Sequence, residues 1–126
     1  MNYWLLFGGV TIVIVAIAHS VLGERLIFKG MRERRIVPTK GYPILRERYV
    51  RILWATWHIV SLLGVGFGAV LFYLSIPEPV NHASYTLVAI SLSTGLSSLL
   101  VLYATKGMHP GWIGLLIVCI ATWLGR

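Results

Sequence analysis

The chain has 126 residues, of which 57% are hydrophobic and 12% are charged, and its formal net charge is +7. A soluble domain carries about 25% charged residues, so the composition excludes an ordinary soluble enzyme, and the length allows one domain, residues 1–126. The positive charge does not indicate nucleic-acid binding, because nine of the eleven Lys and Arg residues lie in one segment between two apolar runs.

Four apolar runs predict an all-α fold, a four-helix transmembrane bundle. A membrane-spanning helix needs roughly 20 mostly apolar residues. The runs cover residues 3–22, 52–75, 84–105 and 108–123. We interpret the first run as a retained span and not a signal peptide. It has no basic residues before it, and the charged pair Glu24 and Arg25 follows it directly.

The distribution of basic residues predicts the topology. Short loops rich in Lys and Arg stay in the cytoplasm, which places the segment 23–51 there, together with Lys106 between the last two spans. The loop 76–83 has no Lys or Arg and contains Glu78, which suits the outer side. Both termini are therefore predicted outside. The basic loop is expected to bind anionic headgroups of the bilayer, in a multi-pass protein of the bacterial inner (plasma) membrane.

Small and hydroxyl side chains indicate the faces on which the helices pack. In the first run Gly8, Val15 and His19 share a helical face, and small residues allow a neighbouring helix to approach closely. In the third run Ser91, Ser98 and their neighbours form a polar stripe. Hydroxyl groups of this kind bond across to another helix or back to their own, and a polar conduit is the alternative.

Three histidines are the best candidates for a functional site. His19, His58 and His109 fall at the same end of the predicted spans, and Glu24 lies just beyond the first span. Ionisable groups at membrane depth are costly and usually face a bundle interior or a cavity. Neutral imidazole is also the commonest protein metal ligand. The four side chains are therefore candidate ligands of Zn²⁺, Fe or Cu.

His19 and His58 are also candidates for holding a b-type haem. They lie at similar depth on two spans joined by a single loop, and haem iron can take axial histidines. The glycines Gly9 and Gly64 leave room for a flat ring beside them. Such a cofactor would connect the protein to electron transfer. The alternative is that no cofactor binds and the two histidines make structural hydrogen bonds.

Two strings carry a resemblance to a known group of proteins. The string from His19 to Glu24, His-Ser-Val-Leu-Gly-Glu, and the pair Trp57-His58 resemble those of small bacterial membrane proteins with four spans and no assigned function. The resemblance covers mainly the first two spans and the junction after each. It implies the four-span topology and the inner membrane, and it carries no activity.

Three functional hypotheses follow from the sequence. The first is a cofactor-binding membrane protein with haem or metal on His19 and His58 near the cytoplasmic face. The second is a non-catalytic accessory subunit, working as a homo-oligomer or within a larger membrane complex. The third is a small transporter or channel that uses the hydroxyl stripe. An interfacial hydrolase or transferase with His19, Glu24 and His58 as acid and base is a further alternative.

Overall fold

The computed structural model describes residues 1–41, 45–77 and 81–126, and within these ranges the regular structure is helical, with no strand. The elements are α1 (Tyr3–Leu22), α2 (Glu47–Ser75), α3 (His82–Thr105) and α4 (Gly111–Leu124). A π-helical turn, η1 (Gly23–Phe28), and a short 3-10 turn, η2 (Lys29–Met31), extend α1. The all-α prediction is confirmed.

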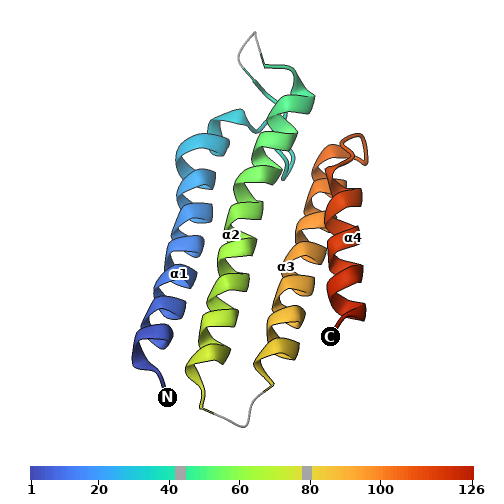
Figure 1. Cartoon of the computed structure of the whole chain (residues 1–126). Helices are drawn as coiled ribbons and strands as arrows, with labels where there is room; N and C mark the ends of the chain where they lie inside the picture. Colours follow the sequence, from blue (N-terminus) through green and yellow to red (C-terminus); the bar gives the residue numbers. More distant parts are fainter. Residues whose placement is uncertain (42–44, 78–80) are drawn as a thin grey trace.

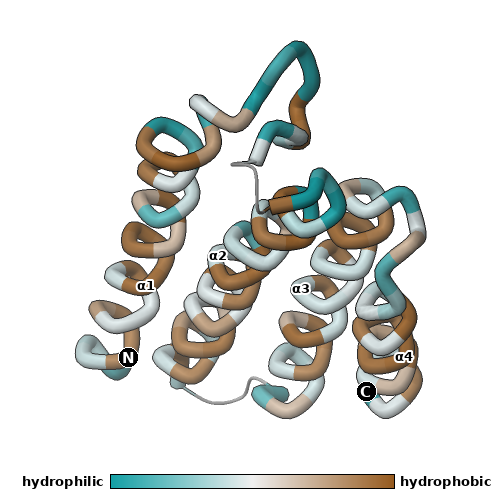
Figure 2. The backbone as a smooth tube through the Cα atoms, turned by 90° about the horizontal axis from the view of Figure 1, so that it is seen from above, coloured by the Kyte–Doolittle hydropathy of each residue, from teal (hydrophilic) through white to brown (hydrophobic). Residues whose placement is uncertain are grey.

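The four long helices lie next to one another in chain order, with α1 against α2, α2 against α3 and α3 against α4 (Figure 1). Both termini lie at the end of the bundle opposite the segment between η2 and α2 (Figure 1). We call the end that carries this segment the loop end. Hydrophilic residues gather in this segment, whereas the helices are mostly hydrophobic (Figure 2).

Side chains and backbone geometry set the helix ends. The Oδ1 atom of Asn2 accepts hydrogen bonds from the backbone N–H of Trp4 and Leu5 at the start of α1. Asn81 accepts from Ser84 in the same way at the start of α3. Both use the preference of Asn for the position before a helix. The left-handed conformation of Lys106, with φ of 53°, ends α3 and allows the tight turn into α4.

Three of the helical segments are long and apolar enough to cross a membrane: Tyr3–Met31, Glu47–Ser75 and His82–Thr105. The fourth, Gly111–Leu124, is apolar but has only 14 residues. At 1.5 Å per residue it is about 21 Å long, and a bilayer core is about 30 Å thick. The predicted fourth span, residues 108–123, is therefore a shorter helix. The predicted position of Glu78 on the outer side lies outside the described residues.

The face of α1 that packs on α2 differs from the predicted one. Gly9 and Ala16 are buried, whereas Val15, expected to share a packing face with His19, is 58% exposed. Gly9 and Gly68 meet backbone to backbone, because a Cβ added at either one would lie 3.1 Å from the other's carbonyl oxygen. In the same interface, a Cβ added at Gly64 would lie 3.1 Å from the Cβ of Ala16. The glycines thus serve close helix packing.

The hydroxyl stripe of α3 packs against α4. Ser91 Oγ donates to the carbonyl oxygen of Cys119 at 2.9 Å, and Ser98 Oγ donates to that of Trp112 at 2.7 Å. Ser97 and Thr94 donate back to carbonyl oxygens of their own helix. These contacts support the packing interpretation of the stripe. They give the otherwise apolar α4 two polar attachments to the bundle.

A cluster of buried apolar side chains lies at the loop end. Phe28 and Val37 pack with Trp54 and Ala55 of α2 and with buried residues of α3. Arg51 is 4% exposed. It donates to the carbonyl oxygen of Ala104 at 3.0 Å and to Glu47 at 2.8 Å. This core fixes the position of α2 relative to η1 and α3, beside the candidate site.

Candidate functional site

Glu24 is the centre of a polar cluster between α1 and α2. Its Oε1 atom accepts hydrogen bonds from Trp54 Nε1 at 2.5 Å and from His58 Nε2 at 2.8 Å. Its Oε2 atom forms an ion pair with Arg32. Trp54 and His58 are four residues apart, so they point from the same face of α2. A single carboxylate of η1 thus joins this turn to α2 and to the segment after η2.

The other nitrogen of His58 continues the cluster into the helix interface. His58 Nδ1 lies 2.8 Å from Ser20 Oγ, and Ser20 Oγ lies 2.8 Å from Ser61 Oγ, both at hydrogen-bonding distance. Ser20 precedes Glu24 by one helical turn, and Ser61 follows His58 by three residues, which keeps each pair on one face. The result is a continuous chain from Glu24 through His58 and Ser20 to Ser61.

Two arrangements of hydrogens satisfy this chain. An ionised Glu24 only accepts, so His58 Nε2 carries a hydrogen. If His58 is neutral, its Nδ1 accepts from the Ser20 hydroxyl, which in turn accepts from Ser61. If His58 is protonated, Nδ1 donates to Ser20, and Ser20 donates to Ser61. Because hydroxyl hydrogens rotate freely, both arrangements fit the same positions of the nitrogen and oxygen atoms.

The side chains of the cluster are partly buried. The side chains of His58 and Glu24 are 15% and 26% exposed, and that of Arg32 is 31% exposed. The Nε atom of Arg32 is buried and has no hydrogen-bond partner among the described residues. Partial burial strengthens the interactions within the cluster, while the remaining exposure leaves it within reach of a ligand.

An open groove of about 730 Å³ runs from this cluster along the helices. Its apolar lining comes from α1, α2 and α3 and includes Ala16, Ile17, Val21, Leu62, Val65 and Leu100. Its polar lining is the cluster itself, Ser20, Glu24, Arg32, Trp54, His58 and Ser61. Ile17 and Val65 are 57% and 44% exposed. On a membrane-spanning helix such side chains face lipid, so the groove opens toward the bilayer.

His19 lies apart from this cluster. Its ring stacks on Trp57, with centroids 4.3 Å apart and planes 8° apart. Trp57 Nε1 donates to the backbone carbonyl oxygen of His19 at 3.0 Å. His19 lines a second groove of about 320 Å³, together with Val60 and Phe67, whereas His58 lines the first. The two histidines therefore contact different partners in the described structure.

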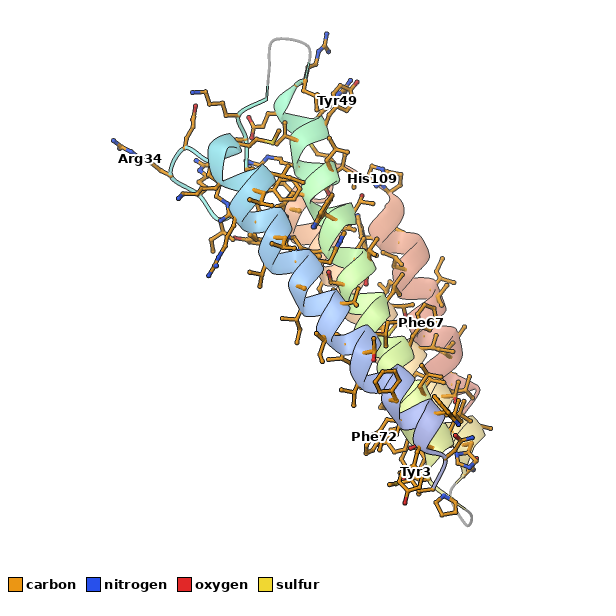
Figure 3. All side chains as sticks on the ribbon, turned by 90° about the vertical axis from the view of Figure 1, so that its left-hand side faces the viewer. Tyr3, Arg34, Tyr49, Phe67, Phe72 and His109 are labelled. Atoms are coloured by element: carbon orange, nitrogen blue, oxygen red, sulfur yellow. The ribbon has the colours of Figure 1, made fainter. Side chains whose placement is uncertain are left out.

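The predicted ligand set is only partly brought together. Glu24 and His58 are in contact, but among the described residues no group of three or more His, Cys, Asp or Glu side chains is placed to hold a metal ion. His109 accepts a hydrogen bond from the backbone of Gly111 and lies near Tyr49 at the α4 side of the loop end (Figure 3). Both ring nitrogens of His58 are engaged, so ligation of iron would require one of these bonds to break.

Sequence reasoning found Glu24 and His58 but missed their partners. Ser20, Ser61 and Trp54 were assigned no site role, and Arg32 was one of nine basic residues in a loop. The signal was present as helical spacing, because Ser20 and Glu24 are four residues apart and so are Trp54 and His58. What the spacing could not provide was the register of α1 against α2.

Comparison of the chain with protein-family models, curated proteins and solved structures gives no match. The resemblance to small bacterial four-span membrane proteins therefore stays a prediction, and the function is argued from the site alone.

Proposed function

We propose that this protein binds an amphiphilic molecule of the bilayer in the groove between α1, α2 and α3. The apolar tail would lie against Ile17, Val21 and Val65, and the polar head against the chain formed by Ser20, His58 and Glu24. The observation that carries the proposal is that the polar and the apolar side chains of the groove lining form two separate groups. Its hydroxyl, imidazole, carboxylate and guanidinium groups are clustered, and the rest is apolar.

A polar cluster at one end of an apolar groove favours a ligand with a polar head and an apolar tail. Polar groups near a membrane normally face a bundle interior or a water-filled cavity, and this cluster forms one end of an open groove whose remaining lining is apolar. A polar head group would extend this network at Glu24 and Arg32, whose side chains are 26% and 31% exposed. Binding sites of this kind are mostly apolar with a few convergent polar groups.

A photoreactive long-chain alcohol with a diazirine in its chain tests the proposal in reconstituted liposomes. We expect crosslinks to concentrate on residues 16–21 and 62–65, and excess unlabelled alcohol to compete for them. The substitution Val65→Trp would fill the groove from its open side and reduce this labelling about fivefold, which corresponds to roughly 1 kcal/mol.

The control is Leu99→Trp, which adds the same side chain at a position of α3 that is 62% exposed and does not line the groove. It should label as the unmodified protein does. Labelling that no alcohol concentration saturates, or that Val65→Trp leaves unchanged, would refute a defined binding site.

The cofactor hypothesis makes a different prediction. A bis-histidine haem requires a Soret band in the reduced-minus-oxidised spectrum, lost in both His19→Ala and His58→Ala. A metal site requires stoichiometric metal without that band. Either result would replace the proposal made here. The accessory-subunit and transporter hypotheses, the homo-oligomeric state and the predicted side of the termini stay predictions as well.

A further inference from the structure

A cavity of about 680 Å³, distinct from both grooves described above, lies at the loop end next to the polar cluster. Its charged lining comes from the segment after η2 and from the start of α2. The charged residues are Arg32, Arg34, Arg35, Lys40, Glu33 and Glu47. The lining therefore has four cations and two carboxylates, which gives a formal charge of 4 − 2 = +2.

Ion pairs already neutralise part of this lining. Arg32 pairs with Glu24 of the polar cluster, and Glu47 pairs with Arg51 at 2.7 Å. Within the described ranges, Arg34, Arg35 and Lys40 form no ion pair. All three are exposed and contribute to the lining, with Glu33 as the one remaining carboxylate of the lining. The side chain of Arg34 extends away from the bundle (Figure 3). The cavity thus has an excess of cations that favours an anion.

The backbone brings these cations together. The N–H groups of Thr39 and Lys40 both donate to the carbonyl oxygen of Met31, at 3.1 and 2.9 Å. These two bonds fold the segment 32–40 back on η2, so that Lys40 lines the same cavity as the arginines at its beginning. The charges therefore surround one cavity and are not spread along an extended loop.

Arg32 connects this cavity to the groove, because it lines both. One side of its guanidinium group pairs with Glu24, while its buried Nε has no hydrogen-bond partner in the described part of the chain. A ligand whose tail lies in the groove would therefore reach the cavity beside this guanidinium group. Guanidinium groups match phosphate oxygens in bidentate geometry.

We propose that this cavity binds a phosphate group, so that the amphiphile is a phosphorylated one with its tail in the groove and its phosphate among Arg32, Arg35 and Lys40. This inference rests on the proposed function. A phosphate group offers more oxygens and up to twice the charge of a carboxylate. It therefore suits Arg35 and Lys40, which form no ion pair within the described residues, together with Arg32, better than a fatty-acid head would.

The test uses displacement of the photoreactive alcohol from the full chain in a mild neutral detergent. Unlabelled hexadecyl phosphate and hexadecanol are the competitors. We expect hexadecyl phosphate to displace the probe at about tenfold lower concentration. The double variant Arg35→Gln/Lys40→Gln should lose this advantage while hexadecanol still competes.

A matched control separates a site from general attraction to a basic loop. Arg25→Gln/Lys29→Gln removes the same two residue types, one Arg and one Lys, from positions that do not line the cavity. It should keep the tenfold advantage. Equal losses in the two double variants would mean diffuse attraction of anions and would overturn the proposal.

The remaining outcomes distinguish this inference from the proposed function. If hexadecanol displaces the probe and the phosphate compound has no advantage, the groove stands and the phosphate assignment fails. If neither competitor displaces the probe, the groove itself fails and the inference falls with it. Broadening of the ³¹P signal of inorganic phosphate that requires Arg35 and Lys40, without any advantage for hexadecyl phosphate, would indicate a free-phosphate site and overturn the head-group assignment.

Discussion

Replacing Glu24 with alanine is expected to lower the free energy of unfolding by about 2–4 kcal/mol. The carboxylate accepts from Trp54 and His58 and pairs with Arg32, so one substitution leaves three partners from two segments unsatisfied. Partial exposure of the cluster places the effect below that of a fully buried ion pair. Thermal or denaturant unfolding of the detergent-solubilised protein, followed by tryptophan fluorescence, measures the loss.

Glu33→Ala is the matched control for Glu24→Ala. Glu33 also lies between α1 and α2, in the segment after η2, and it is exposed. Within the described residues it forms no ion pair or side-chain hydrogen bond. Its removal should change stability by no more than about 0.5 kcal/mol. Glu24→Gln keeps an acceptor oxygen and loses the charge, so its effect should lie between the two. Similar stabilities for the two alanine variants would show that the cluster does not hold α1 to α2.

The second large effect is expected from Gly23→Ala, which should cost about 2–3 kcal/mol of stability. A Cβ at this position would overlap the indole of Trp57, at 2.6 Å from its Cε2 atom. The ring cannot move aside without loss, because it stacks on His19 and donates to the backbone of that residue. Its edge also faces Phe28, with centroids 5.9 Å apart.

Gly30→Ala provides the comparison for Gly23→Ala. Gly30 lies in the helical turn η2, and a Cβ there would have no neighbour within 4 Å. Both substitutions reduce the freedom of the unfolded backbone in the same way, so the difference between them isolates the clash with Trp57. Equal unfolding midpoints would mean that α1 and α2 adjust at little cost, and would remove the argument for a fixed register between them.

The sequence predicted the helices well because hydropathy sums a local property over many residues. The predicted run 3–22 is α1, and the predicted ends at Ser75 and Thr105 are the ends of α2 and α3. The starts were less accurate, since α2 begins at Glu47 and α3 at His82. Both include polar first turns that a search for apolar runs leaves out.

The pairing of side chains could not be predicted in the same way. The sequence placed His19 and His58 at one end of adjacent helices, and the structure puts their rings against Trp57 and Glu24 respectively. Trp57 and His58 are neighbours in α2, so about 100° of rotation separates the directions in which they point. The depth of a residue along its helix gives no information about the direction in which its side chain points.

The composition and the apolar runs are enough to predict an all-helical protein with segments long and apolar enough to cross a membrane and a basic segment at one end, because these properties are sums over individual residues. The contacts of Glu24 with Trp54, His58 and Arg32, and the groove that begins at them, are visible in the packed helices alone. Those contacts depend on the register at which Gly9, Ala16 and Gly23 let α1 approach α2. Such a register is a property of two surfaces in contact, and neither helix specifies it alone.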